Sequence, residues 1–189
     1  MLEKIDEALF GGVDIVQLRS KTLSDAELFK IGEAIRKITA KHRKLFFVND
    51  RVDLMLALQA DGVHLGQDDL PINIARKLMK NYPGLIGKST HSLAQALQAE
   101  KEGADYIGFG PIFKTPTKPT YQPVGLRLIP HLNKKIKIPL VCIGGINSQN
   151  VDRVIRAGGK RVAVVRAVFD QSNIRRAAQK LKERMCHEF

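Results

Sequence analysis

Charged side chains of both signs stand in this sequence just after short apolar runs, where buried strands are expected to end. The cations Arg19, Lys21 and Lys118 and the acids Asp50 and Asp69 belong to this set. Lys and Arg neutralise phosphate, and Mg²⁺ often takes only one or two carboxylates, with water and substrate phosphate completing its shell. The set therefore predicts a site for a phosphorylated small molecule, a diphosphate above all, with Mg²⁺ bound by Asp50 and Asp69.

The two acids also have a structural alternative. An Asp directly after a strand often caps the following helix through its side chain. Pro71 is expected to begin the helix after Asp69, which leaves the capping role open to Asp68 or Asp69. We interpret Asp68 as the bystander of this pair.

Two backbone segments suit phosphate binding. Residues 111–123 hold four prolines and three threonines and form the longest stretch without periodicity. Long loops of this kind inside compact domains are usually functional, although a surface loop stiffened by proline is the alternative. Gly144 and Gly145 end a predicted strand and open a predicted helix, so their N–H groups could point at a phosphate.

The histidines point away from zinc. His64 and His91 fall near predicted strand ends, but the sequence has no His-Glu-x-x-His or Cys-x-x-Cys spacing. We interpret His64 as a packing residue at the rim. His91 is interpreted as a helix cap, with substrate contact as its alternative.

The elements that must position these residues alternate regularly along the chain. Apolar runs typical of strands in a parallel sheet cover residues 13–18, 45–48, 62–65, 85–86, 106–109, 138–143 and 162–168. The run at 85–86 is the shortest. Amphipathic helices are expected at residues 2–9, 24–41, 52–59, 73–81, 93–102, 126–133, 149–157 and 173–184.

Seven strands and eight helices predict an α/β fold, a TIM (β/α)₈ barrel that lacks its first β-strand. A doubly wound sheet is the competing architecture, disfavoured because no Gly-rich dinucleotide-binding turn follows an early strand. Segments 12–17, 61–66 and 103–108 look like one helix-to-strand corner used three times. Glycines such as Gly103 and Gly158 are expected to end helices, and Ser24 with Glu27 predicts a capping box.

The composition is that of an ordinary globular protein, with 189 residues, 44% hydrophobic and 26% charged, and we expect one domain over residues 1–189. No apolar run reaches the roughly 20 residues of a membrane span, no leader peptide is visible, and there are only two cysteines, of which Cys142 is expected in the core. These features predict a cytoplasmic protein with no membrane partner.

The net charge of +12, from 31 Lys and Arg against 19 Asp and Glu, suits anionic partners. The basic residues are spread along the chain and aromatic residues make up only 6%. A phosphorylated small-molecule substrate is therefore favoured over nucleic acid.

Taken together, the motifs resemble the thiamine-phosphate synthase family, which also contains a thiazole tautomerase branch with the same barrel. The resemblance is carried, in order along the chain, by segments 17–21, 49–51, 61–69, 87–91, 103–118 and 143–146. It implies a transferase that joins 4-amino-2-methyl-5-hydroxymethylpyrimidine diphosphate to a thiazole phosphate. The implied route is dissociative and Mg²⁺-assisted, so electrostatic stabilisation of the leaving diphosphate would dominate catalysis.

The resemblance also implies roles for individual residues. The pyrimidine diphosphate would be bound by Gln17, Arg19, Lys21, Asn49, Ser89 and Lys118, of which Arg19, Lys21 and Lys118 would be catalytic. The thiazole phosphate would be bound by Thr115, Thr117, Gly145, Val165 and Arg166. Asp50 and Asp69 would hold Mg²⁺.

The sequence departs from the family pattern in two places. Arg166 stands where the family usually has Ser. The apolar strand that normally precedes the opening helix is absent, so relative to that pattern the chain looks N-terminally truncated. An open barrel exposes two strand edges, and a homodimer through that edge is one expectation.

Two other functions stay open at this point. A thiazole tautomerase would not need the diphosphate-binding set, and Pro111 stands where that branch is expected to place a histidine. A non-catalytic regulatory or nucleic-acid-binding paralogue would instead use the basic surface.

Overall fold

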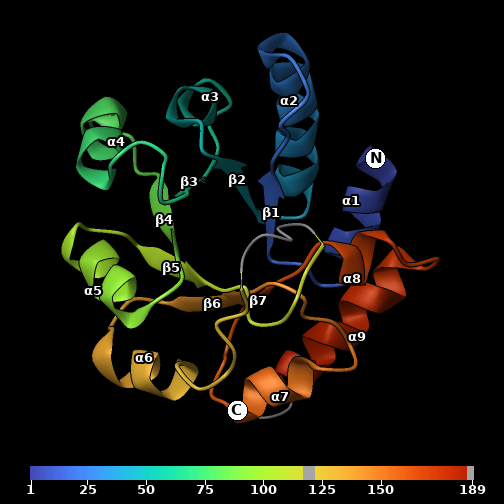
Figure 1. The fold of residues 1–189 in the computed structure, drawn as a ribbon. Coiled ribbons are helices and arrows are strands. Elements are labelled where there is room, and N and C mark those ends of the chain that lie inside the picture. The colour runs from blue at the N-terminus through green and yellow to red at the C-terminus, as the bar shows by residue number, and fades with distance from the viewer. Residues whose placement is uncertain (117–121, 187–189) are drawn as a thin grey trace.

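The fold is an open, curled parallel sheet with helices outside it, shown by a computed structural model that describes residues 1–116 and 122–186 (Figure 1). The strands are β1 (Ile15–Leu18), β2 (Leu45–Asn49), β3 (Gly62–Leu65), β4 (Leu85–Thr90), β5 (Tyr106–Phe109), β6 (Leu140–Ile143) and β7 (Val162–Ala163). The helices are α1 (Leu2–Phe10), α2 (Asp25–Lys41), α3 (Val52–Ala57), α4 (Ile72–Met79), α5 (Leu93–Lys101), α6 (Ile129–Lys135), α7 (Val151–Arg156), α8 (Arg166–Phe169) and α9 (Ile174–Cys186).

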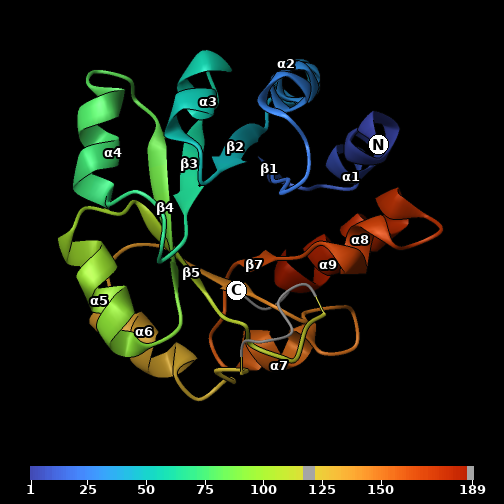
Figure 2. The same cartoon turned by 45° about the horizontal axis from the view of Figure 1, so that its top comes forward.

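The strands lie in the sheet in the order in which they follow one another along the chain, and every pair is parallel. Among the described residues, β1 and β7 do not pair with each other, so the sheet stays open between them. The helix layer, in contrast, continues past this opening because α1 packs against both α9 and α2 (Figures 1 and 2). The prediction of a barrel that lacks its first strand is confirmed.

The two faces of the sheet differ in burial. On β1, Val16 and Leu18 are buried in the core shared with the helices, whereas Ile15 and Gln17 on the other face are exposed. Cys142 on β6 is fully buried, as predicted, and burial raises the pKa of its thiol to about 12. The inner face of the curled sheet is therefore accessible near the open edges, and the core lies between sheet and helices. In the part of the chain that the structure describes, no helix has the length and apolar character needed to cross a membrane.

Several local predictions are confirmed at the helix ends. The Oγ of Ser24 accepts the N–H of Glu27, while a Glu27 carboxylate oxygen accepts the N–H of Ser24 at 2.9 Å, which makes the predicted capping box. Gly103 and Gly158 follow α5 and α7 with φ of +89° and +92°, a conformation that favours glycine.

Two strand predictions are wrong. The run at 162–168 is not one strand: β7 ends at Ala163, and residues from Arg166 form the short helix α8. Among the described residues β7 pairs on one side only, and the backbone groups that follow it bond within a helical turn, as when the N–H of Phe169 donates to Val165 O at 2.9 Å. The described residues thus contain nine helices instead of eight.

The second error concerns the run at 85–86, which belongs to β4, the longest strand of the described sheet. Its later residues, Lys88 to Thr90, are polar and hid the strand from a search for apolar runs. In addition, α6 begins at Ile129 and not at residue 126, and it ends at Lys135 and not at residue 133.

Candidate active site

The carboxyl ends of β1 and β2 form one half of the candidate site. Lys21, Asn49 and Asp50 line a hollow of about 220 Å³ there, together with apolar side chains of both strands and of α2 and α3. The ion pair of Arg51 and Asp25 also lines it. Gln17 lies on the exposed inner face of β1, and Arg19 follows that strand as an exposed side chain. The structure therefore brings Lys21, Asn49 and Asp50 together and leaves Gln17 and Arg19 on the adjoining edge strand.

Asp50 is held in an unusual backbone conformation. Its φ is +64°, and its N–H donates to the carbonyl of His64 at 2.8 Å. This bond ties the end of β2 to β3, since Asn49 and His64 are partners in the strand register. The left-handed turn thus fixes where the Asp50 carboxylate leaves the sheet.

Arg51, the next residue, is bound by two neighbouring carboxylates. Its guanidinium donates to Asp25 at 2.6 Å and to Asp53 at 2.7 and 2.9 Å. Hydrogen bonds from Arg51 lower the pKa of both carboxyl groups. In the described part of the chain neither Arg19 nor Lys21 forms an ion pair, so these two cations keep their charge available at the rim.

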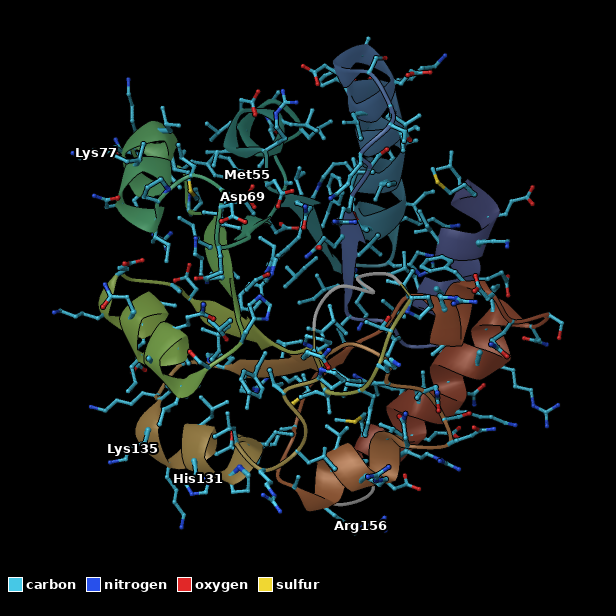
Figure 3. The ribbon with its side chains drawn as sticks, viewed as in Figure 1. Met55, Asp69, Lys77, His131, Lys135 and Arg156 are labelled. Atoms are coloured by element: carbon cyan, nitrogen blue, oxygen red, sulfur yellow. The ribbon has the colours of Figure 1, made fainter. Side chains whose placement is uncertain are left out.

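The turn after β3 positions the second acid. A carboxylate oxygen of Asp69 accepts the N–H of Gly66 at 2.6 Å, and a Cβ on Gly66 would lie only 2.7 Å from that oxygen. Pro71 precedes α4, which has no side-chain cap, so neither Asp68 nor Asp69 caps this helix. In Figure 3 Asp69 lies on the inner side of α4, whereas Lys77 of the same helix points outward. Asp68 is exposed, as expected of a bystander.

Lys88 supports this turn from within the sheet. It lies within β4 on the buried face, and its Nζ donates to the carbonyl of Gly66 at 2.6 Å. A second hollow of about 240 Å³ beside it is lined by Asp69 and by Gln67, Gln95 and Gln98. Lys88 therefore supports the turn that holds Asp69 from the helix-facing side of the sheet. Ser89, the next residue, faces the inner side.

The inner face of the middle strands carries a hydrogen-bonded chain that sequence reasoning missed. His64 Nδ1 lies 2.8 Å from Tyr106 Oη, and His64 Nε2 lies 2.9 Å from Ser89 Oγ. Burial raises the pKa of the Tyr106 phenol. The interpretation of His64 as a packing residue left out these bonds, because Tyr106 reads as an ordinary strand aromatic. Three polar residues at alternate positions of neighbouring strands are the signal that could have found it.

His91 does not cap a helix. Ser92 is the N-cap of α5, with its Oγ accepting from Gln95 N–H at 3.2 Å. The ring of His91 instead bonds the carbonyl of Gly110 at the end of β5. His91 thus links two strand ends.

The loop after β5 packs closely on the turn after β6. The N–H of Ile112 donates to Ile143 O at 2.8 Å, and that of Phe113 donates to Gly144 O at 3.0 Å. Gly145 has φ of +65°, and a Cβ there would lie 2.6 Å from the carbonyl of Lys114. Thr115 follows on this loop, whereas the predicted ligands Thr117 and Lys118 lie outside the described residues.

The segments expected to bind the second phosphate, at residues 144–145 and 165–166, differ in detail from their prediction. α7 begins at Val151, so Gly144 and Gly145 open a turn and not the helix itself. Val165 is the exposed N-cap of α8. The guanidinium of Arg166 donates to Asp170 at 2.7 Å, one helical turn away, and remains largely exposed.

A parallel, barrel-like α/β protein with cations, two acids and glycine turns at the carboxyl ends of its strands belongs to the class of TIM-barrel-type enzymes. The sequence profile described as thiamine monophosphate synthase matches residues 1–168. The chain belongs to this family.

Individual relatives agree over nearly the whole chain. It is 42% identical over 182 residues to the thiamine-phosphate synthase of Pyrococcus furiosus, covering 96% of this chain and 87% of the relative. It is 49% identical over 180 residues to that of Chlorobium phaeovibrioides, covering 95% and 86%. A solved thiamine phosphate pyrophosphorylase from Pyrococcus furiosus superposes with a TM-score of 0.90 at 40% identity, covering 97% and 88%.

Proposed function

We propose that this chain is a thiamine-phosphate synthase, a transferase that joins 4-amino-2-methyl-5-hydroxymethylpyrimidine diphosphate to a thiazole phosphate. The bond between the pyrimidine's exocyclic carbon and the diphosphate breaks first, and the electron pair leaves with the diphosphate. The thiazole nitrogen then donates its lone pair to that carbon, which gives thiamine phosphate and free diphosphate. The observation that carries the proposal is the hollow at the ends of β1 and β2, lined by Lys21, Asn49 and Asp50, in a chain of this family.

The diphosphate half of the substrate would lie at the ends of β1, β2 and β4. Arg19 and Lys21 offer cations that form no ion pair in the described part of the chain, and Lys118 completes the catalytic set. Gln17, Asn49 and Ser89 would donate hydrogen bonds to the same group. Charge-assisted bonds of this kind gain strength as negative charge gathers on the leaving group.

Asp50 and Asp69 suit a magnesium ion. Their carboxylates come from the ends of neighbouring strands, and Asp69 is folded back onto the β3 turn. Within residues 1–116 and 122–186 no group of three or more acidic, His or Cys side chains gathers, so substrate and water would complete the shell of a two-carboxylate ion. When bound, the ion would neutralise charge on the leaving diphosphate.

The thiazole phosphate would lie at the ends of β5 to β7. Gly145, Thr115 and Thr117 would offer backbone and hydroxyl donors there. Val165 and Arg166 would close the cup, and Arg166 adds a cation whose present partner is Asp170.

The thiazole tautomerase alternative gains no support from the site. Pro111 packs against Gly144, with only 2.5 Å between its Cα and a Cβ built at that glycine. A proline side chain cannot move a proton, and a tautomerase would not need the cation set. One domain over residues 1–189, the cytoplasm as its location and a homodimer as its assembly stay predictions.

The test is turnover of the purified chain with both substrates across a Mg²⁺ titration, scored by thiamine phosphate and diphosphate released. Arg19→Ala should weaken use of the pyrimidine diphosphate by about 1.5–3 kcal/mol, the scale of a hydrogen bond to a charged group. Lys135→Ala is the matched control, because Lys135 ends α6 on the outside of the molecule (Figure 3). Absent turnover together with tight, salt-sensitive duplex binding would overturn the proposal and favour the nucleic-acid-binding alternative.

A further inference from the structure

We infer that Tyr106 and His64 are positioning residues that orient the Ser89 hydroxyl so that its proton points at the anionic leaving group. This inference rests on the proposed function, in which Ser89 contacts the diphosphate. Its structural basis is the chain of two hydrogen bonds from Tyr106 Oη through the His64 ring to Ser89 Oγ.

The direction of this chain follows from what each group can donate. Among the described residues, the partner of Tyr106 Oη is His64 Nδ1 alone. The phenol is buried, and burial raises its pKa, so the group keeps its proton and needs an acceptor. If Tyr106 donates to Nδ1, the neutral imidazole carries its proton on Nε2.

The second bond then runs in the same direction. Nε2–H donates to Ser89 Oγ, which uses a lone pair of the serine oxygen and leaves the serine proton for another acceptor. A diphosphate can only accept hydrogen bonds at its oxygens, so it is the complementary partner. With the opposite tautomer, Ser89 would donate to His64 and turn a lone pair toward the anion, which would repel it.

The sheet is built to seat these rings. Tyr106 lies against Gly87, where any Cβ would come within 2.1 Å of the ring, and His64 lies against Gly108, where a Cβ would lie 3.0 Å away. The two rings are 5.5 Å apart between centroids. Two strand positions are thus restricted to the smallest residue so that the Tyr106 and His64 rings fit on the inner face.

Ser89, where the hydrogen bonds end, is also held through its backbone. Gln67 Nε2 donates to the Ser89 carbonyl at 2.5 Å, which anchors the strand at that residue. Asn49, a proposed diphosphate ligand, is the register partner of His64 on the neighbouring strand. The chain of hydrogen bonds from Tyr106 to Ser89 therefore ends next to the site where the proposed substrate would lie.

The first test is the tautomer of His64 in the unmodified, ligand-free protein. Side-chain ¹⁵N chemical shifts, assigned with the variant His64→Gln, would be measured at about pH 8, where an ordinary histidine is neutral. The expected result is a proton on Nε2 and none on Nδ1. A proton on Nδ1 would overturn the inference, whether or not the chain turns over substrate.

The second test is a double-mutant cycle in kcat. Ser89→Ala should lower kcat about 10- to 100-fold, since it removes a donor to developing charge. Tyr106→Phe should lower kcat about 2- to 10-fold with little change in KM, because only the orientation of that donor is lost. In the Ser89→Ala background, Tyr106→Phe should have no further effect.

Tyr82→Phe is the matched control. It removes a phenol that donates to the Ala60 carbonyl at 2.9 Å, a bond of nearly the same length outside the site. Its kcat should equal that of the parent protein even if its melting temperature falls. An equal loss of kcat from Tyr106→Phe with and without Ser89 would show a merely structural hydroxyl and overturn the inference. If the parent protein shows no turnover, the proposed function fails. The tautomer of His64 alone then tests whether the hydrogen bonds orient Ser89 as inferred.

Discussion

The aspartates that precede β5 and β1 show how differently the middle and the edge of this sheet are held. Asp105, before β5, accepts the N–H of Ile86 in β4 at 2.6 Å and pairs with Arg76. Asp14, before β1, is bound by Lys44 at 2.8 Å and by Lys182 at 2.5 Å. Among the described residues no strand lies on the far side of β1 to offer an N–H. The same helix-to-strand corner is thus bound by strand backbone in the middle and by lysine side chains at the edge.

The inner face of the sheet repeats this contrast. In the middle strands it carries packed rings and the chain of hydrogen bonds that ends at Ser89. On the edge strand β1 it carries Ile15, which is 45% exposed, and Gln17, which is exposed as well. Gln17, Arg19 and Lys21, the proposed ligands of the diphosphate, stand on or just after the edge strand β1. The middle is therefore preorganised, whereas Arg19 and Lys21 follow a strand that, among the described residues, pairs on one side only.

The largest expected effect is on packing in the middle. Ile86→Ala should lower the free energy of unfolding by about 2–5 kcal/mol, because Ile86 is fully buried. Ile15→Ala, its matched control on the edge strand β1, should cost less than about 1 kcal/mol because that side chain is already 45% exposed. Urea denaturation of both variants measures the difference, and equal losses would remove the contrast between the two regions.

The next effect separates activity from stability. Asp69→Asn and Asp50→Asn should each lower kcat/KM about 100-fold, or about 2.7 kcal/mol, by removing a charged ligand of the proposed magnesium ion. Asn can still accept the Gly66 N–H and tolerates the positive φ of residue 50, so the fold should persist. Near-normal rates in both variants across a Mg²⁺ titration would contradict the metal assignment, and a large loss of melting temperature would mean that the acids are structural.

A smaller effect is expected where the aspartate corner meets a strand. Asp105→Ala should lower the free energy of unfolding by about 1–3 kcal/mol, since it leaves the N–H of Ile86 without its acceptor in a buried place. Thermal or urea unfolding at neutral pH checks this value. A change in the free energy of unfolding that is within experimental error would show that water replaces the carboxylate. The aspartate would then stabilise the middle of the sheet no more than Asp14 stabilises its edge.

The sequence was sufficient for the architecture because alternation of apolar and amphipathic segments is a local signal. Five of the strands and the capping box at Ser24 follow from residue types within a few positions of one another. The apolar pattern extends the last strand to residue 168, because an apolar run does not reveal where strand gives way to helix. β4 was underestimated since Lys88 and Ser89 face opposite sides of the sheet, which no single-segment pattern shows.

The candidate site was predictable in its members and less so in their contacts. Residues after strands meet at one end of a parallel sheet, which was enough to group Lys21, Asn49 and Asp50. The role of Arg51 as a clamp on two acids and that of Lys88 as a support under Gly66 depend on side-chain directions. The link between His64 and Tyr106 joins residues 42 positions apart, and only the register of three strands brings them together.

The smallest effect is expected from Asp14→Ala at the edge, and it should depend on pH and salt. Partial burial pushes the pKa of Asp14 upward, but hydrogen bonds from Lys182 and Lys44 outweigh burial and hold that pKa below its ordinary value. Because the pKa is lower in the folded protein, the carboxylate stabilises the fold above the ordinary pKa, and this contribution is lost as the pH falls through the lower, folded value. At pH 7 the variant should lose less than about 1 kcal/mol of its free energy of unfolding, since these are partly exposed ion pairs.

This loss should shrink in 1 M salt and disappear in acid. The loss from Asp105→Ala, in contrast, should persist in salt because its main source is a buried backbone N–H. Urea denaturation of both variants at low and high salt measures this, and a salt-independent loss at Asp14 would mean that packing, and not charge, holds the edge of the sheet.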